Sequence, residues 1–220
     1  MKLKYYFQVN WLKTIYFNFK MLPFKSAVKL PVMIFAKTKI SSLKGKINIT
    51  SSVSHAMIKI GRCEVSHYRT HSTILSIAGT VNFFGKASLG RGSALEVKKN
   101  GHLSIGRQFR TTAGTTIICD HEISIGDGFL SSWDNLIMDS DHHDIMDRSG
   151  KIINPPRSVT VGKHVWLGCR TTLLKGCCLP DNCIVAAGSV LTKSFSQSDS
   201  IIGGCGSDQR ILRRDIEWKE

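Results

Sequence analysis

Residues 138–145 read Met-Asp-Ser-Asp-His-His-Asp-Ile and bring together side chains suited to acid–base chemistry. An imidazole has an unperturbed pKa of about 6.5, so His142 or His143 can remove a proton from a substrate near neutral pH. A carboxylate beside the ring, from Asp139 or Asp141, would orient it and stabilise the imidazolium that forms. The stretch predicts a general base with supporting carboxylates, although carboxylates that merely cap a loop would give the same pattern.

The same stretch opens an insertion in an otherwise periodic chain. A six-residue spacing of apolar residues stops after Ile137 and resumes at Val159, and the residues between are rich in Gly, Pro, Asp and Asn. These residue types favour turns, and a long loop on a rigid scaffold is a usual place for function. We therefore predict a protruding loop over residues 138–158.

The scaffold is predicted from the apolar spacing itself. In the C-terminal half, consecutive aliphatic residues are separated by six positions at Val161, Leu167, Leu173, Leu179, Val185 and Leu191. This period fits neither a helix nor a hairpin, but it is the signature of hexapeptide parallel β-helices. Each step would form one side of a triangular coil, and stacked coils would bury a continuous apolar core. We therefore predict a mainly β fold.

The two ends of the chain lack this period. Lysines and aromatic residues alternate near the N-terminus, where Pro23 and Pro31 would interrupt any single long helix. Short β-branched runs separated by glycine begin at about residue 47. The predicted organisation is an N-terminal basic and aromatic extension over 1–46, a β-helix over 47–195, and a C-terminal cap over 196–220 with a short helix within 211–218.

The net charge predicts an anionic partner. Thirty Lys and Arg against 16 Asp and Glu give +14, and no acidic residue precedes Glu64. The N-terminal composition is typical of segments that lie on an anionic membrane surface, and equally of a helical lead-in packed on the main domain. Nucleic acid is not an expected partner, because charge is its single supporting feature.

Cysteine content and hydropathy favour a cytoplasmic protein, peripheral at the inner face of the membrane. The seven cysteines form an odd set without a C-x-x-C pair, which argues against a disulfide scaffold and a zinc site. No apolar run approaches the roughly 18 to 20 residues that a membrane-spanning helix needs, and the first residues lack the order of a signal peptide.

Four segments together resemble the hexapeptide-repeat acyltransferases, in particular bacterial O-acetyltransferases of capsule, lipopolysaccharide and other sugars. They are Ser-Trp-Asp at 132–134, Asp-Ser-Asp-His-His at 139–143, Val-Trp-Leu-Gly at 165–168 and Ala-Ala-Gly-Ser-Val-Leu-Thr-Lys at 186–193. The resemblance covers most of the chain. It implies a left-handed parallel β-helix, an exception to the right-handed preference of parallel crossovers. It also implies a homotrimer with active sites between neighbouring subunits.

The resemblance also implies a reaction. The family pattern Asp-x-His-x-Ile places the catalytic base at His143, with Asp141 and Asp139 as supporting residues. The implied activity is direct transfer of acetyl from acetyl-CoA to a carbohydrate hydroxyl, without a metal or a covalent acyl-enzyme. The base removes the hydroxyl proton while the oxygen attacks the thioester carbonyl.

Cofactor and acceptor residues are likewise implied by the family match. The cofactor set is Gly168, Cys169, Ala186, Ala187, Thr192, Lys193, Arg210 and Arg213, and the acceptor set is Trp133, Asp134 and Trp166. Small residues would let the pantetheine arm lie close to the coil, and the cations would meet the nucleotide phosphates. The tryptophans would serve equally well as covers of a coil edge. One departure lies at 206–210, where relatives read Gly-Asn-Pro-Ala-Lys and this chain has Gly-Ser-Asp-Gln-Arg.

Two other functions fit a β-helix. Carbonic anhydrases of this fold bind zinc through three histidines between subunits, and the chain offers His121, His142, His143 and His164. A basic β-helix can also be a non-catalytic scaffold for glycans or membranes. The four acyltransferase-like segments favour an acyltransferase over both of these functions.

Overall fold

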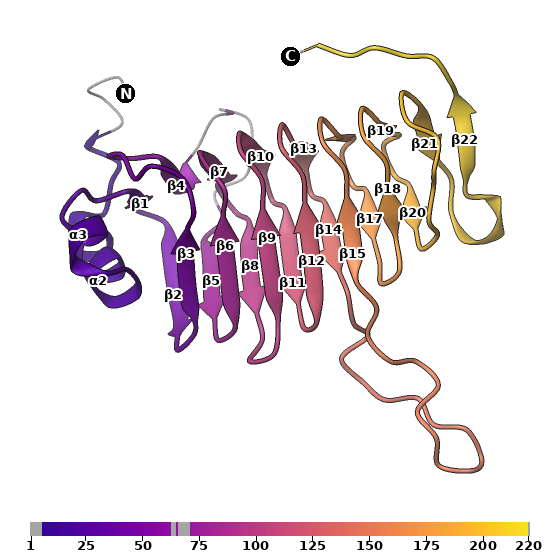
Figure 1. The fold of residues 1–220 in the computed structure, drawn as a ribbon, viewed down its shortest axis with the longest axis horizontal. Helices are drawn as coiled ribbons and strands as arrows, with labels where there is room; N and C mark the ends of the chain where they lie inside the picture. Colours follow the sequence, from indigo (N-terminus) through magenta and orange to yellow (C-terminus); the bar gives the residue numbers. More distant parts are fainter. Residues whose placement is uncertain (1–5, 63–64, 66–70, 220) are drawn as a thin grey trace.

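The computed structural model describes residues 6–62, 65 and 71–219, and most of them form a triangular coil of short strands (Figure 1). From β1 to β20, successive strands enter three sheets in turn, so each sheet collects every third strand, whereas β21 and β22 both join the first sheet. The first sheet contains β1 (Val32–Ile34), β4 (Ile58–Arg62), β7 (Ala87–Gly90), β10 (Phe109–Ala113), β13 (Leu130–Trp133), β16 (Trp166–Leu167), β19 (Ile184–Val185), β21 (Ile201–Gly203) and β22 (Arg210–Arg213).

The other two sheets complete the triangle, and their strands pair in parallel. The second sheet contains β2 (Thr38–Leu43), β5 (Thr73–Ile77), β8 (Ala94–Val97), β11 (Thr116–Cys119), β14 (Leu136–Met138), β17 (Thr172–Leu173) and β20 (Val190–Leu191). The third contains β3 (Lys46–Ile49), β6 (Thr80–Phe83), β9 (His102–Ile105), β12 (Glu122–Ile125), β15 (Val159–Val161) and β18 (Cys178–Leu179).

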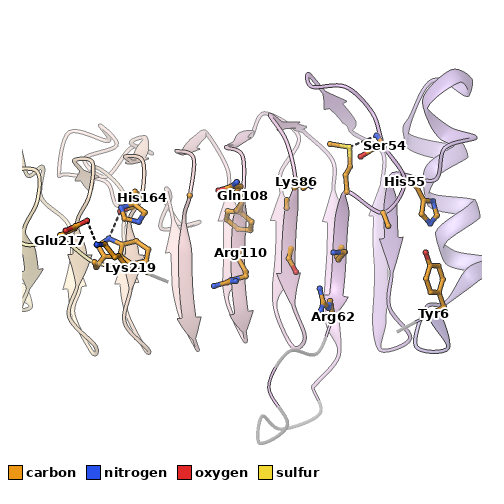
Figure 2. Close-up of a pocket in the computed structure, with 18 residues that line it drawn as sticks. Tyr6, Ser54, His55, Arg62, Lys86, Gln108, Arg110, His164, Glu217 and Lys219 are labelled. Carbon is orange, nitrogen blue, oxygen red and sulfur yellow. Dashed lines mark hydrogen bonds and ion pairs between the residues drawn. The ribbon is translucent and has the colours of Figure 1, made fainter. Parts of the chain in front are cut away.

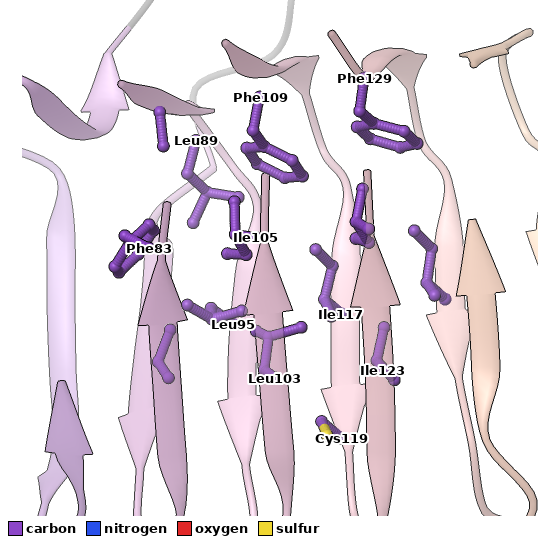
Figure 3. Packing of buried hydrophobic residues seen from close by; sticks show 14 of the residues in the cluster. Phe83, Leu89, Leu95, Leu103, Ile105, Phe109, Ile117, Cys119, Ile123 and Phe129 are labelled. Carbon is purple, nitrogen blue, oxygen red and sulfur yellow. The ribbon is translucent and has the colours of Figure 1, made fainter. Parts of the chain in front are cut away.

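The predicted apolar ladder forms the core and confirms the mainly β, parallel coil. Its six residues, from Val161 to Leu191, lie one on each strand from β15 to β20, and none is more than 2% exposed. Earlier coils fill the interior in the same way (Figure 3), and the rings of Phe109 and Phe129 stack with centroids 5.2 Å apart. Because one strand per side cannot bury its apolar face alone, stability comes from stacking coil on coil.

The coil begins earlier than the predicted boundary after residue 46. Strands β1, β2 and β3 pair in register with β4, β5 and β6, so a complete turn of the coil starts at Val32. Exposed lysines on the outer positions, such as Lys39 and Lys46, hide its apolar alternation in the sequence. The loop occupies residues 139–158, since β14 ends at Met138 and β15 begins at Val159, so Met138 belongs to the coil.

Helices α2 (Trp11–Met21) and α3 (Phe24–Ala27) lie at the N-terminal end of the coil (Figure 1). Asn18 accepts a hydrogen bond from the Val32 N–H at 3.1 Å and donates to the Val32 carbonyl at 2.7 Å. Thr14 Oγ1 accepts from the Ile34 N–H at 3.0 Å. These side chains therefore take the place of a further strand on the free edge of β1. Within the described ranges, no helix is both long enough and apolar enough to cross a lipid bilayer.

The predicted C-terminal helix within 211–218 is wrong. Residues Arg210–Arg213 form strand β22, which pairs antiparallel with β21, and a single 3-10 turn spans Gly206–Asp208. The edge of β21 offers backbone partners that outweigh the weak helical preference of this segment. The tail beyond β22 returns along the coil, and the Trp218 ring stacks on His164 with centroids 3.9 Å apart.

Candidate functional site

The loop between β14 and β15 projects from the coil as a hairpin (Figure 1). The Ile153 N–H donates to the Ile145 carbonyl at 2.8 Å, and the Ile145 N–H donates to the Asn154 side chain at 2.6 Å. His143 lies at the base of this hairpin and is exposed. The segment predicted to carry the base is therefore an internally bonded arm.

Asp139 joins the start of the arm to the coil. Its side chain is fully buried and accepts hydrogen bonds from the backbone N–H groups of Asp120 at 2.8 Å and His121 at 2.9 Å. Its carbonyl accepts from the Arg157 N–H at 3.1 Å, so the two ends of the arm are tied together. Burial, followed by the Asp139 charge, raises the pKa of the neighbouring Cys119 thiol to about 12.

Asp141 holds the arm through two partners that the sequence analysis missed. Its carboxylate accepts hydrogen bonds from Lys175 Nζ at 2.5 Å and from Asn154 Nδ2 at 2.8 Å. The same Asn154 amide donates to the His143 carbonyl at 2.8 Å. Lys175, and then Asn154, hold the pKa of Asp141 below its ordinary value. The contacts of Asp139 and Asp141 thus position the backbone on which His143 sits, whereas the sequence analysis expected them beside its ring.

The neighbouring His142 has a different setting. Its Nδ1 lies 3.4 Å from the Asp120 carboxylate, and its backbone N–H donates to Ser140 Oγ at 3.1 Å. His164 is engaged elsewhere, against Trp218. Across the described part of the chain, no three His, Cys, Asp or Glu side chains gather closely enough to hold a metal ion. Within one chain, the four histidines considered for zinc therefore do not converge.

The predicted pantetheine residues gather at the corner between the first and second sheets. Gly168 and Cys169 follow β16, Ala186 and Ala187 follow β19, and the Gly188 N–H donates to the Cys169 carbonyl at 2.9 Å. A Cβ added to Gly168 would lie 2.6 Å from the Ala187 nitrogen, so the two turns approach more closely than any other residue allows. Ala187 and Gly188 are exposed, which leaves a narrow strip of backbone open at this corner.

The predicted nucleotide-contacting residues form a separate group at the other end of β20. Gln209 is buried, and its side chain bonds the Thr192 N–H at 2.8 Å and the Thr192 hydroxyl at 2.9 Å. Lys193 Nζ donates to the Ser207 carbonyl at 3.2 Å, and Arg210 is ion-paired with Asp208. Gln209, which the sequence analysis passed over, thus holds the segment that departs from the family pattern. Arg213 lies exposed on β22.

The structure separates the predicted acceptor residues. Trp133 ends β13 and Asp134 follows it, at the corner of the pantetheine residues, and the Arg170 N–H donates to the Trp133 carbonyl at 3.0 Å. Trp166 begins β16, at the opposite end of the neighbouring strand. Its indole N–H donates to Ser132 Oγ at 3.1 Å, and its ring lies 6.0 Å from that of Trp218. Trp133 and Asp134 can share a site with the pantetheine corner, whereas Trp166 packs beside the tail.

Within one chain, the arm and the pantetheine corner lie at opposite ends of the strands of the second sheet. The arm leaves β14 toward the third sheet, whereas the turns after β16 and β19 lead from the first sheet into the second. A base on the arm and a thioester at that corner therefore meet most directly when two copies of the chain are placed side by side.

Comparisons with known proteins agree with this architecture. No protein-family model matches the chain. The chain is 30% identical over 114 residues to the galactoside O-acetyltransferase of Escherichia coli K12, covering 51% of this chain and 54% of that protein. It is 28% identical over 122 residues to the polysialic acid O-acetyltransferase of Escherichia coli O1:K1, covering 54% of this chain and 39% of that protein. It thus spans about half the length of the first relative and less of the second.

The crystal structure of the polySia-specific acetyltransferase NeuO has the same fold, with a TM-score of 0.54 and 20% identity over 84% of this chain and 89% of that chain. The predicted left-handed parallel β-helix is therefore confirmed. Fold and sequence similarity agree with each other: the chain is similar to O-acetyltransferases and resembles the hexapeptide-repeat acyltransferases, as its sequence motifs predict.

Proposed function

We propose that the chain transfers acetyl from acetyl-CoA to a hydroxyl group of a sugar or polysaccharide. The observation that carries this proposal is the exposed His143 on an arm whose backbone is held by Asp139 and by the Asp141–Lys175 pair. Such an arrangement leaves the imidazole accessible while it restricts its position, as a general base requires. The similarity to two sugar O-acetyltransferases supports the choice of acceptor.

The proposed reaction is a direct attack. The acceptor hydroxyl gives its proton to the His143 imidazole while its oxygen adds to the thioester carbonyl. The tetrahedral intermediate then expels the coenzyme A thiolate, which takes the proton from the imidazolium. The bond from acyl carbon to sulfur breaks, and the bond from acyl carbon to acceptor oxygen replaces it.

Acetyl-CoA is proposed to lie along the corner formed by Gly168, Cys169, Ala186 and Ala187. The exposed backbone at Ala187 offers a narrow approach for the pantetheine arm. Lys193 and Arg213 provide positive charge for the phosphates, and Arg210 does so once it exchanges Asp208 for a phosphate. Trp133 and Asp134 are proposed to contact the acceptor, because they lie at the same corner.

We infer that the working form is a homotrimer. His143 and the pantetheine corner lie at opposite ends of the strands of the second sheet. When two chains lie side by side, the base of one chain can therefore reach the thioester that its neighbour holds. Size-exclusion chromatography with light scattering tests this inference, and a monomer with full activity would contradict it.

The central experiment replaces His143. We expect His143→Ala to lower kcat by about 10²–10⁴-fold for transfer to galactosides or sialic acid polymers, with assembly and melting temperature unchanged. The matched control is His142→Ala, which removes the adjacent histidine and should retain most of the activity. Full activity in His143→Ala would refute the role of this residue. Absence of transfer by wild type to any glycan would refute the proposed reaction.

Peripheral contact with an anionic membrane, at its cytoplasmic face, is proposed for helix α2. One face of α2 packs on the coil through Thr14, Phe17, Asn18 and Met21. On another face, Leu12, Ile15, Tyr16 and Phe19 are exposed at i, i+3, i+4 and i+7, and no acidic residue precedes Glu64. An apolar stripe within a basic segment suits an anionic bilayer surface.

Vesicle sedimentation tests this contact. We expect the protein to sediment with phosphatidylglycerol-containing vesicles and not with pure phosphatidylcholine. Leu12→Ser combined with Phe19→Ser should abolish the binding, and Ile74→Ser, which changes an exposed apolar residue on β5, should not. Equal sedimentation of all three proteins would refute the membrane contact.

A further inference from the structure

A groove of about 1000 Å³ lies on the first sheet, between the N-terminal helices and the C-terminal tail (Figure 2). Its floor crosses β4, β7 and β10, so its long axis follows the stack of coils. From β4 to His164, which precedes β16, it covers four strand spacings, or about 19 Å. This length suits a chain of several sugar units better than a single small molecule.

The lining of the groove is strongly basic. Among its described residues, five are Lys or Arg, whereas Glu217 is the single acidic one; the five are Lys59, Arg62, Lys86, Arg110 and Lys219. Lys59 and Arg110 are aligned across the sheet, since both are register partners of Ser88 on the strand between them. Their backbones are therefore two strand spacings apart, about 10 Å. Cations repeated along a groove complement a polymer that carries repeated negative charges.

The two ends of the groove carry stacked rings. At the N-terminal end, Tyr6 stacks with His55, with centroids 6.4 Å apart and planes at 9°. At the other end, His164 and Trp218 stack with planes at 5°. Between these ends the floor offers hydroxyl and amide groups, including Ser88 and Gln108. A single-stranded nucleic acid site would instead place aromatic rings at successive steps along the cations. Hydroxyl and amide groups between aromatic ends suit sugar rings.

The groove is distinct from the arm of the same chain. It lies on the first sheet, whereas the arm leaves the coil between the second and third sheets and projects from the opposite side of the molecule (Figure 1). A ligand in the groove would therefore be bound away from its own chain's His143.

We propose that this groove is an exosite for an extended acidic glycan, bound through carboxylates spaced along the polymer. That the bound glycan is also the acceptor of acetyl transfer rests on the proposed function. That the groove binds the glycan does not. The exosite would hold a long acceptor on the enzyme between successive transfers. It would therefore lower KM for long acidic polymers and leave KM for short neutral sugars unchanged.

Binding is tested on the full chain without acetyl-CoA, with fluorescent polygalacturonate fragments as the probe and dextran as the neutral control. We expect Lys59→Gln with Arg110→Gln to weaken binding about tenfold, because two charge-assisted contacts are lost. The matched control is Lys44→Gln with Lys99→Gln, which removes the same charge elsewhere and should have little effect. Lys86→Glu, a single change at an exposed position, provides a second test should the double variant fold poorly.

Three outcomes would overturn the proposal: equal affinity in the groove and control variants, equal binding of dextran, or stronger binding of single-stranded DNA with the same variant dependence. The His143→Ala variant should bind polygalacturonate as wild type does while losing transfer. Groove variants that keep wild-type affinity and transfer would refute the exosite and leave the reaction standing. Groove-dependent binding without any acetyl transfer would refute the reaction and leave the exosite standing.

Discussion

The Lys175 ammonium lies 2.5 Å from the Asp141 carboxylate and joins the turn after β17 to the arm that carries His143. The Lys175 side chain is 15% exposed, whereas that of Asp141 is 41% exposed, so the cation is the more enclosed partner. Lys175 also donates to the Asn154 carbonyl at 2.9 Å. One lysine thereby fixes both sides of the hairpin base.

Removing this cation should impair turnover more than stability. Lys175→Met keeps most of the unbranched side chain but removes the ammonium that binds Asp141, and we expect kcat to fall about 10–100-fold, because small displacements of a catalytic group are costly. The melting temperature should change little, since an ion pair whose carboxylate is exposed to solvent contributes little to stability. Steady-state kinetics and calorimetry measure both effects. Lys151→Met, on the exposed part of the arm, is the control; wild-type kcat in Lys175→Met would contradict the assignment.

The pH dependence of the arm follows from the pKa of Asp141, which Lys175 and Asn154 lower from 3.8. A lowered carboxyl pKa stabilises the arm above the unfolded value, and this contribution is lost as the pH falls through the lower folded value. We therefore expect hydrogen exchange in residues 139–158, corrected for intrinsic rates, to be constant from about pH 5 to 8 and to rise only below about pH 4. A transition near pH 6 would instead implicate a histidine.

Asp139 should matter for stability. Asp139→Ala leaves the N–H groups of Asp120 and His121 without their buried acceptor, and we expect a loss of about 3 kcal/mol in the free energy of unfolding. Urea denaturation at pH 7 measures the loss. Asp144→Ala removes an exposed carboxylate of the same arm and should be neutral. Equal stability of the two variants would show that Asp139 is not structural.

The cysteines should differ sharply in reactivity. Burial raises the pKa of Cys119 and of Cys177 to about 12, so both remain protonated and slow to alkylate at pH 8. Cys205 is exposed, and Cys169 and Cys178 are partly exposed, so iodoacetamide should label these three before the buried thiols. Coenzyme A should protect Cys169, as mass spectrometry can show. A stable acetyl adduct on a cysteine required for turnover would refute direct transfer.

Gln209 should influence the affinity for acetyl-CoA. Gln209→Ala removes the bonds to Thr192 and loosens the segment around Lys193 and Arg210. We expect KM for acetyl-CoA to rise about fivefold with kcat nearly unchanged, corresponding to the loss of about one hydrogen bond. Gln197→Ala, at an exposed glutamine, is the control. An unchanged KM would place the nucleotide elsewhere.

The coil was predictable because every step from Val161 to Leu191 obeys one local rule, with an apolar residue facing inward every six positions. The protruding loop was predictable because the rule stops before it and resumes after it. The first turn was missed because outward lysines on β2 and β3 mask the same rule.

Contacts between distant residues were not predictable. Lys175 and Asp141 are 34 positions apart and meet because the coil places the turn after β17 beside the arm. Residues Arg210–Arg213 form a strand because the edge of β21 is available, a condition that the amino acids of this segment do not encode. The fold followed from local spacing, whereas the arrangement of the site depends on how neighbouring coils stack.

The side chains of Asn18 and Thr14 on the first strand have a consequence for self-association. An uncovered parallel strand is a template onto which another molecule can add its own backbone, and repeated addition produces fibres. By occupying the N–H groups of Val32 and Ile34, α2 removes that template. A chain cut before Val32 would retain its stacked core but would leave the edge of β1 unpaired. We expect such a chain to polymerise in solution.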